Sequence, residues 1–379
     1  MTIGIDLRCL PSDGSFGAGV AHAARAMTRA LAVLEAPEVA WVLYVPEGAD
    51  IGDSLQERCR IVRMRTASGT SLRRALRDVP CDRLFIPSGA VAPGLSVPCI
   101  PWVHDVAIFE HPEWFGESLF RRMVTTRLFR QGIRRAEKIL AVSEDTRGRL
   151  IRLFRKDPDM VTVTHEGGDE VLGSTHGTSL REGKQRAKRR LAERGISQPF
   201  VLMLGTLEPR KNIPLLIEAW HRSVASSSRP YDLVIGGRDG WKLGSIIAAF
   251  DEAKAYVSEH GPHLHRVQAI SDDDRRDLLL AADVVAVPSM HEGFGLTALE
   301  AMQAETAVIA SNVGGLPEAL QGAGLLLPPQ DTDAWAGALK GLFEDDEARM
   351  ALALEGKARS QGMTWERTAK IALGVLTSR

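Results

Sequence analysis

The sequence predicts an α/β protein built from two Rossmann-like domains, each around a parallel sheet. The chain has 379 residues, which exceeds the usual size of a single domain. Along both halves, short apolar runs that end at polar or glycine-rich turns alternate with helical patterns, which is the order of βαβ units. The clearest unit spans residues 283–318, where a buried-strand pattern, a polar loop, a helical pattern and a second buried strand follow one another.

The first half begins with a buried strand at residues 2–7, a glycine-rich turn at 13–19 and a helix at about 20–34. Ser143 is placed to cap a later helix, although a ligand contact is an equally open interpretation. Residues 173–197 are polar and turn-rich, so the domain boundary is expected near residue 172, giving domains 1–172 and 173–363. Further strands of the first domain are expected at 39–45, 61–64, 84–86, 100–103, 138–142 and 161–164.

The second half is predicted to carry a sheet of its own. Ser271 can cap the helix that follows its third strand, and the acidic triplet 272–274 is typical of that helix start rather than of a metal site. Thr364 is the expected N-cap of a last helix over residues 364–379, which the sequence alone allows to lie on either domain. The strands are expected at 200–204, 232–235, 266–269, 284–287 and 307–310.

Composition limits the classes of function. The contents of 44% hydrophobic and 25% charged residues are ordinary for a globular protein, and a net charge of −1 gives no general reason to expect nucleic-acid binding. The four cysteines lie in the first third of the chain without zinc-like spacing. Neither a signal-peptide pattern nor an apolar run long enough to span a bilayer is visible. A cytoplasmic protein that can touch a membrane surface is therefore expected.

Two carboxylates bracket the loop of the clearest unit. Glu292 precedes the helix that begins near Leu296, and Glu300 lies inside that helix. The glycines between them let a backbone approach a ligand, and the first N–H groups of a helix favour electron-rich groups. Glu300 can accept hydrogen bonds from a diol such as ribose, and Glu292 can do the same for a sugar. From spacing alone, the favoured interpretation is that Glu292 is an acid at the helix start and Glu300 a solvated helix residue, because short motifs match by accident.

Two adjacent cations follow the first strand of the second half. Arg210 and Lys211 come after Gly205 in the run Gly-Thr-Leu-Glu-Pro-Arg-Lys-Asn. Together they can stabilise the charge on a departing diphosphate without a metal, Arg as a two-oxygen fork and Lys as a compact charge. The alternative is an ordinary basic helix start, which the helix dipole would disfavour.

Two further features of the first half are open to more than one interpretation. Gly17 and Gly19 lie in a strand–turn–helix layout that suits phosphate, but a dinucleotide fingerprint would need glycine where His22 stands, so NAD binding is not supported. Residues 117–138 form one strongly basic helical pattern. It is either a solvated surface or a site of attraction for anionic lipid headgroups or a lipid diphosphate acceptor.

A third feature is His104, which ends a strand together with Asp105. A polar pair at this place is where open α/β sheets bind ligands, although such a histidine is often only structural.

The runs Glu-Gly-Phe-Gly-Leu, Leu-Glu-Ala-Met, Gly-Gly-Leu-Pro-Glu and Glu-Pro-Arg-Lys-Asn resemble the signature of retaining nucleotide-sugar glycosyltransferases, the large group 1, family 4-like set of mannosyl-, rhamnosyl- and glucosyltransferases. The resemblance covers most of the chain. It implies the GT-B fold, with a donor between two Rossmann-like domains, and a last helix that crosses back to the first domain through residues 356–362.

The resemblance also implies roles for particular residues. Arg210 and Lys211 would bind the donor diphosphate, and His104 would reach the donor sugar. The sequence departs from the family pattern after Gly19 and at residues 165–168, which weakens the case for side-chain contacts from those loops. The implied donor-binding set is Gly17, Gly19, Gly205, Arg210, Lys211, Glu292, Gly293, Phe294, Gly295, Leu296 and Glu300, with His104, Arg210, Lys211 and Glu292 as catalytic residues and no metal or other cofactor.

The expected function is a retaining, metal-independent transfer of a sugar from a nucleotide-diphospho-sugar, with GDP-mannose or a related deoxysugar donor favoured by the resemblance. The acceptor would be a glycan or a lipid-linked molecule in surface polysaccharide synthesis. The protein would be cytoplasmic, with peripheral contact at the inner membrane face through residues 117–138. The alternatives are a nucleotide-sugar epimerase or a phosphorylase of the same fold, and a non-catalytic nucleotide-sugar-binding subunit.

Overall fold

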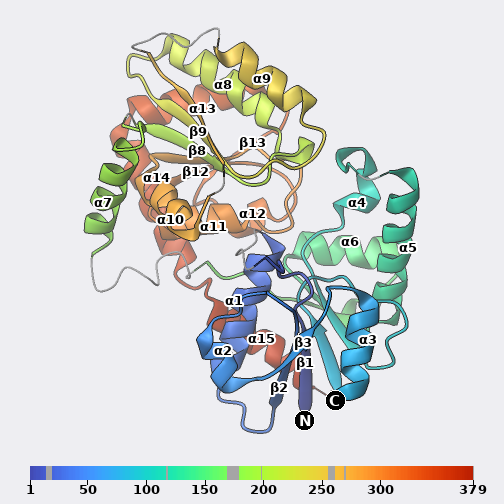
Figure 1. Cartoon of the computed structure of the whole chain (residues 1–379). Helices are drawn as coiled ribbons and strands as arrows, with labels where there is room; N and C mark the ends of the chain where they lie inside the picture. The colour runs from blue at the N-terminus through green and yellow to red at the C-terminus, as the bar shows by residue number, and fades with distance from the viewer. Residues whose placement is uncertain are drawn as a thin grey trace. The chain divides into compact units, whose positions relative to one another are not determined.

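The computed structural model describes residues 1–13, 19–116, 118–168, 179–197, 199–254, 261–268 and 270–378 (Figure 1). The chain divides into two compact units. The first unit comprises Met1–Pro112, Glu117–Gly167 and Met363–Arg379, and the second comprises Glu113–Gly116 and Gly168–Gly362. The expected boundary at residue 172 lies in 169–178, outside the described residues. The last helix belongs to the first unit, together with the N-terminal strand.

The first unit is built on a seven-stranded parallel sheet with the order β3-β2-β1-β4-β5-β6-β7. Its central strands are almost wholly buried, as expected for a parallel sheet with helices on both faces. The strand order reverses direction beside β1, which in open α/β sheets is where ligands bind. The strands are β1 (Thr2–Asp6), β2 (Ala40–Pro46), β3 (Arg60–Met64), β4 (Arg83–Ile86), β5 (Cys99–Val103), β6 (Ile139–Ala141) and β7 (Val161–Val163).

Helices cover this sheet in separate groups. The C-terminal helix α15 packs beside α1, which also contacts α2. One core joins α3 to the strands β2 to β5, and another joins α5 and α6 to β5, β6 and β7. The helices are α1 (Val20–Val33), α2 (Asp53–Arg58), α3 (Gly69–Asp78), α4 (Ala107–Glu110), α5 (Leu119–Arg135), α6 (Glu144–Phe154) and α15 (Trp365–Thr377), with single 3-10 turns at Pro112–Trp114 and Pro158–Met160.

The second unit is built on a six-stranded parallel sheet with the order β10-β9-β8-β11-β12-β13. The strand order again reverses direction, here between β8 and β11. Because every strand is parallel, the carboxyl ends of β8, β9, β11 and β12 meet at one edge of the sheet. The strands are β8 (Phe200–Leu204), β9 (Asp232–Gly236), β10 (Leu264–Val267), β11 (Val284–Val287), β12 (Ala307–Ser311) and β13 (Leu325–Leu327).

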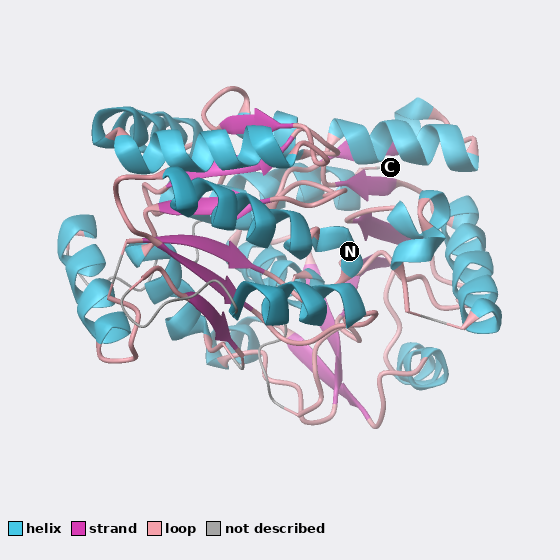
Figure 2. Cartoon of the chain, turned by 90° about the horizontal axis from the view of Figure 1, so that it is seen from above, coloured by secondary structure: helices cyan, strands magenta, loops and turns pink. Residues whose placement is uncertain are grey.

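Helices lie on both faces of this second sheet (Figure 2). The core on one face joins α8, α9 and α13 to alternate residues of the strands and contains the buried indoles of Trp220 and Trp335. On the other face, α7 contacts α10, and α11 contacts both α10 and α14. The helices are α7 (Leu180–Ala192), α8 (Ile213–Ser226), α9 (Gly244–Lys254), α10 (Asp272–Ala281), α11 (Leu296–Gln303), α12 (Leu316–Leu320), α13 (Thr332–Glu344) and α14 (Asp346–Ser360), with a 3-10 turn at Pro209–Lys211.

The predicted fold class of two parallel-sheet α/β domains is confirmed, as are the three predicted helix caps. The side chains of Ser143, Ser271 and Thr364 accept hydrogen bonds from backbone N–H groups of their helices, α6, α10 and α15. Two details were wrong. The strand expected at 266–269 begins at Leu264 and ends at Val267, and the crossing region expected at 356–362 is shorter because α14 continues to Ser360. None of the described helices is long and apolar enough to cross a membrane.

Candidate active site

The carboxyl edge of the second sheet brings the two predicted cations beside one of the predicted carboxylates. Gly205 directly follows β8 and has a φ of +151°, which favours glycine. A Cβ at Gly205 would lie 3.3 Å from Cε of Lys211, which is close to the limit for atoms in contact. Glycine at this position therefore leaves room for the side chain of Lys211 beside the end of β8.

Arg210 is fixed by contacts on three sides. Its Nε and Nη2 donate to Oε1 of Glu208 at 3.0 and 2.7 Å, and its Nη1 donates to the carbonyl of His291 at 2.9 Å and to Oε2 of Glu292 at 3.2 Å. Its own carbonyl accepts from the backbone N–H of Met290 at 2.8 Å. The guanidinium thus joins the turn after β8 to the loop after β11.

Glu292 receives donors from three residues. Lys211 Nζ lies 2.5 Å from Oε1, Ser289 Oγ donates to the same oxygen at 2.6 Å, and Arg210 reaches Oε2. Burial alone would raise the pKa of this carboxyl, but the charges of Lys211 and Arg210 and the bonds from Lys211 and Ser289 outweigh it and lower the pKa from 4.5 to about 2. Glu292 is therefore ionised at neutral pH and neutralises part of the cationic pair.

The loop that carries Glu292 rests on the Gly-Gly turn predicted after the next strand. Gly315 donates its backbone N–H to the carbonyl of Glu292 at 3.0 Å. Gly314 has a φ of +57°, and a Cβ there would lie 2.1 Å from that same carbonyl oxygen. A larger residue at 314 would push the loop away, so this turn fixes the height of the Glu292 backbone above the sheet edge.

The second predicted carboxylate, Glu300, lies inside α11 and is fully buried. Its Oε2 accepts a hydrogen bond from Nη2 of Arg275, in the first turn of α10. The interpretation of Glu300 as a solvated helix residue is therefore excluded. Phe294 is also buried, so its ring is not exposed to contact a sugar. Gly295 has a φ of +111° and stands at the start of α11.

In the first unit, both ring nitrogens of His104 are occupied. Nδ1 lies 3.0 Å from Oε1 of Glu166, and Nε2 lies 2.8 Å from the carbonyl oxygen of Pro87. A carbonyl and a carboxylate accept hydrogen bonds, so both contacts are made at once when each ring nitrogen carries a proton, as in the imidazolium form. Burial opposes this charge, but the hydrogen bond and negative charge of Glu166 outweigh it and raise the pKa of His104.

The remaining predicted residues of the first unit have simpler surroundings. Gly19 stands at the start of α1 with a φ of +57°, and among the described residues nothing lies within 4 Å of where its Cβ would be. Gly17 lies outside the described residues. Asp105 accepts the backbone N–H of Ala107 and thereby holds the turn that follows His104. The structure thus places the predicted residues in two groups, one in each unit.

Sequence reasoning missed four residues whose side chains contact the predicted ones. Glu208 stands two residues before Arg210 in the same turn, so its carboxylate could have been included on spacing. Ser289 closes β11 and could have been noted as a polar residue at a strand end. Nothing in the sequence singled out the other two, Glu166 and Arg275, because they lie 62 and 25 residues from their partners. Within the described part of the chain, no group of three potential metal ligands comes together.

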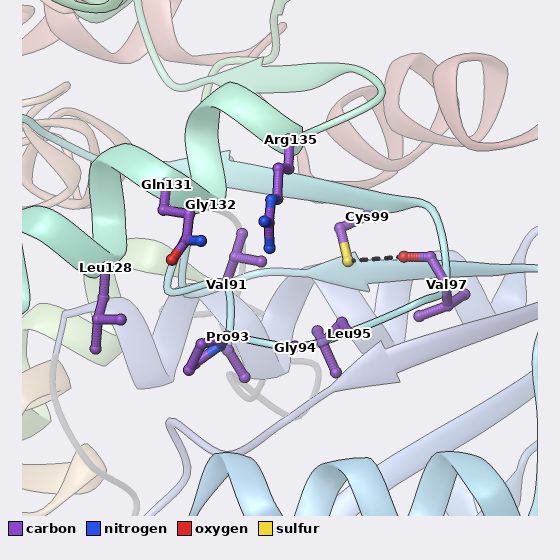
Figure 3. A pocket seen from close by; sticks show the side chains of 11 residues that line it. Val91, Pro93, Gly94, Leu95, Val97, Cys99, Leu128, Gln131, Gly132 and Arg135 are labelled. Atoms are coloured by element: carbon purple, nitrogen blue, oxygen red, sulfur yellow. Dashed lines mark hydrogen bonds between the residues drawn. The ribbon is translucent and has the colours of Figure 1, made fainter.

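A separate small cavity lies in the first unit, between α5 and the segment that joins β4 to β5 (Figure 3). Its volume is about 60 Å³, and Arg135 projects toward its Cys99 side. Burial raises the pKa of the Cys99 thiol to about 12, so this thiol is un-ionised and unreactive at neutral pH. Because the cavity contains none of the predicted site residues, it is not assigned to the candidate active site.

Comparison with known proteins places the chain in a family. The profile of the family described as glycosyl transferases group 1 matches residues 184–359. The chain is 30% identical over 296 residues to O-antigen chain mannosyltransferase B of Escherichia coli, covering 77% of this chain and 73% of that protein. It is 31% identical over 270 residues to a D-inositol 3-phosphate glycosyltransferase of Kineococcus radiotolerans, covering 65% of this chain but only 58% of that relative.

The structural comparison agrees over the full length. The crystal structure of Anabaena HepE in complex with UDP and glucose superposes with a TM-score of 0.73 at 17% identity, covering all of both chains. At this identity the likeness shows the fold alone. The sequence matches show that the chain belongs to the group 1, family 4-like glycosyltransferases. The two parallel-sheet units and the structural likeness show that it has the GT-B fold.

Proposed function

We propose that the protein is a retaining glycosyltransferase that moves a sugar from a nucleotide-diphospho-sugar to a glycan or lipid-linked acceptor in surface polysaccharide synthesis. The observation that carries the proposal is the convergence of Arg210 and Lys211 on Glu292 at the carboxyl edge of the second sheet. The mannosyltransferase relative favours GDP-mannose or a related deoxysugar donor. The UDP and glucose bound by HepE support the wider class of nucleotide-linked donors.

The proposed chemistry uses the two cations in place of a metal. The bond between the sugar's anomeric carbon and the diphosphate breaks, and its electron pair goes to the leaving phosphate oxygen. Arg210 and Lys211 stabilise that charge in a partly dry site. The acceptor hydroxyl attacks from the face that the diphosphate leaves, and the leaving phosphate takes the hydroxyl proton. No protein nucleophile is needed, and the configuration at the anomeric carbon is retained.

Glu292 has a place in this scheme in both the ligand-free and the donor-bound protein. Without donor, it occupies the two cations that the diphosphate would use. A diphosphate carries more charge than one carboxylate and can replace it at Lys211. The carboxylate of Glu292 is then available to accept hydrogen bonds from hydroxyls of the donor sugar. His104 is proposed to reach the sugar as well, which requires it to exchange one of its two present hydrogen bonds.

The proposal also includes a cytoplasmic location with peripheral contact at an anionic membrane surface through α5. This helix contains six arginines and no acidic residue, in a chain whose net charge is −1. Phe120 is 72% exposed, and Met123 and Val124 are exposed one turn further along. Exposed apolar side chains together with arginines fit a bilayer of anionic lipids, which offers headgroup charge and an apolar layer at once. Nucleic acid would pair with the arginines but would offer no apolar layer to the exposed apolar side chains.

The first test is a thermal-shift screen against UDP, GDP, dTDP and their sugar conjugates without added metal, followed by transfer assays. A ligand that binds only the folded state raises the midpoint by mass action. We expect a shift with one nucleotide sugar that is lost in Arg210→Ala and Glu300→Ala. Epimerisation or phosphorolysis without an acceptor would replace the proposal with the corresponding enzyme. Binding without turnover over a broad acceptor panel would replace it with a non-catalytic subunit.

A further inference from the structure

Two arginines of the first unit, which belong to neither group of predicted site residues, meet at the carboxyl edge of its sheet. Arg8 stands two residues after β1, beside the reversal of the strand order, and Arg73 lies on α3, which begins at the same edge after β3. A Cβ at Gly69, the first residue of α3, would lie 3.9 Å from Nη1 of Arg8 and 3.8 Å from Nη1 of Arg73. Both guanidinium groups therefore reach the same place, where Gly69 carries no side chain.

The segment that follows β4 holds both arginines. Arg8 donates from Nε and Nη2 to the carboxylate of the fully buried Asp6, and from Nη2 to the carbonyl of Ala90 at 3.0 Å. Arg73 donates from Nη1 to the carbonyl of Pro93 at 2.7 Å. Because Ala90 and Pro93 are close in sequence, one short segment fixes both guanidinium groups, and no ligand is needed to bring them together.

The contacts of the two arginines leave charge and donors over. The charge of Arg8 is compensated by Asp6, but its Nη1 makes no hydrogen bond within the described residues. In the same part of the chain Arg73 has no ion-pair partner, and its Nη2 donates only to the hydroxyl of Thr70 at 3.0 Å. A guanidinium has five N–H donors, so several remain on each side chain. One uncompensated positive charge and free donors at one place suit an anion with several oxygens, which is the chemistry of a phosphate group.

The place is accessible from solvent. Thr70 is exposed, and Gly69, Arg8 and Arg73 are partly exposed. The Thr70 hydroxyl accepts from Arg73 and can still donate its own proton to a ligand. In open α/β sheets, ligands bind outside the carboxyl ends of the strands where the strand order reverses, and Arg8 stands at that position.

We propose that Arg8 and Arg73 bind a phosphate group of the acceptor, with the Thr70 hydroxyl as a further donor, so that the protein acts on a phosphorylated acceptor. The inference rests on the proposed function, because it assumes that the first unit takes the acceptor of a sugar transfer. It deepens that function by naming the chemistry of the acceptor and two residues that select it. A lipid diphosphate and a soluble sugar phosphate share this chemistry, and the experiment separates them.

The competing explanation is that the two arginines only fasten the segment after β4. In that case, Arg73→Gln would lower the thermal midpoint and leave the affinity for phosphates unchanged. Arg8→Gln is not used, because it would leave the buried carboxylate of Asp6 without its partner and endanger the fold. In Arg73→Gln no buried charge loses a partner, and the glutamine amide can still donate to the carbonyl of Pro93.

The experiment measures the binding of geranyl diphosphate, glucose 6-phosphate and inorganic phosphate by calorimetry. The protein is first saturated with the nucleoside diphosphate that it prefers, which occupies Arg210 and Lys211, so the probes report on a second site. We expect at least one of the two organic phosphates to bind, and Arg73→Gln to weaken it at least about tenfold, because charge-assisted hydrogen bonds are lost. The affinity for the nucleoside diphosphate should not change.

Arg74→Gln is the matched control for this experiment. Arg74 is the next residue along α3 and lies 4.0 Å from the carboxylate of Asp78, so it removes the same charge from the same helix. Its affinity for all three probes should stay at the wild-type value. A preference for geranyl diphosphate supports the inference with a lipid-linked acceptor, and a preference for glucose 6-phosphate supports it with a soluble phosphorylated one.

Four results would overturn the inference. They are no binding of either organic phosphate, an unchanged affinity in Arg73→Gln, an equal loss in Arg74→Gln, and inorganic phosphate bound as tightly as the organic phosphates, which would mean an adventitious ion only. Failure of the proposed function has a different signature, because the wild type would then bind none of the nucleotides. The assignment to an acceptor would fall with it, whereas a loss of phosphate binding in Arg73→Gln would still be measured.

Discussion

Nζ of Lys211 lies 2.5 Å from Oε1 of Glu292 at the carboxyl edge of the second sheet. The cation expected to bind phosphate and the carboxylate expected to bind sugar therefore neutralise each other. Arg210 joins them through Oε2 of the same carboxylate and is also paired with Glu208. Two cations and two carboxylates thus form a balanced group before any donor is bound. A balanced group leaves no uncompensated charge at the sheet edge, and a diphosphate would compete with Glu292 for the two cations.

Glu292→Gln should separate binding of the leaving group from transfer. Without the carboxylate, Lys211 and Arg210 lose an internal competitor, and we expect affinity for the nucleoside diphosphate to rise about tenfold, or about 1.4 kcal/mol. Transfer should become slower, because the sugar hydroxyls lose an acceptor. Calorimetry with the diphosphate and initial rates with the donor measure the two effects. An unchanged affinity together with wild-type transfer would remove Glu292 from the site.

Glu292 should also contribute to acid stability. Its folded-state pKa of about 2 lies below the ordinary value of 4.5, so its contribution is complete above pH 4.5 and is lost as the pH falls toward 2. The difference corresponds to about 3 kcal/mol at most. Unfolding in urea at pH 6 and at pH 3.5 measures the part of this stabilisation that is lost by pH 3.5, which is about 1 kcal/mol. Glu292→Gln should flatten the decline in this interval, whereas Glu366→Gln, which removes an exposed carboxylate that pairs with Lys370, should leave it unchanged.

Several parts of the structure followed from local features of the sequence. Buried parallel strands leave continuous apolar runs such as Val284–Val287, and helix starts leave Ser or Thr before the first turn, as at Ser143. Shorter or half-buried strands carry less signal, and β13, whose three leucines are only partly buried, was not predicted. The predicted position of the edge strand β10 was two residues too late, because this strand is also only partly buried.

The contacts of the candidate site were harder to predict than its residues. Spacing placed Arg210, Lys211 and Glu292 at strand ends, and parallel topology then brought those ends to one edge. Which of them pair in the absence of ligand depends on loop heights, which the Gly314 turn sets by tertiary contact. The pairing of Arg275 with Glu300 could not be predicted, because its partner lies on another helix and a basic residue in a helix is ordinarily solvent-facing.

The pair formed by His104 and Glu166 should appear in a titration. The pKa of His104 is raised, so the stabilisation from the pair is complete below the ordinary value of about 6.5 and is lost as the pH rises through the folded-state value. Glu166→Gln should lower that pKa, because the hydrogen bond and negative charge that favour the protonated ring are lost. Nitrogen-15 spectra of the histidine rings between pH 5 and 9 measure it, with His104→Gln to assign the signal. A ring that titrates at the same pH in Glu166→Gln would show that the carboxylate does not hold the charge.

The membrane contact of α5 should depend on both charge and apolar side chains. Arg127 and Arg134 are exposed on this helix, and each cation near an anionic surface contributes about 1 kcal/mol. Arg127→Gln combined with Arg134→Gln should therefore weaken binding to phosphatidylglycerol vesicles by more than about tenfold at low salt. Sedimentation at 50 and 500 mM salt would measure this, with neutral phosphatidylcholine vesicles to show how much binding needs no charge.

Two further pairs of substitutions complete this test, a control pair on α3 and a pair that removes apolar side chains from α5. Arg74→Gln with Arg77→Gln removes two exposed arginines from another helix of the same unit, α3, and should leave vesicle binding unchanged if α5 is the contact. Phe120→Ser with Met123→Ser keeps every charge of α5 and should still reduce binding, since less apolar area enters the headgroup layer. If the serine pair binds like the wild type, the attraction is electrostatic alone and an acidic protein becomes the better partner. If the two arginine pairs lose binding equally, α5 is not the contact surface.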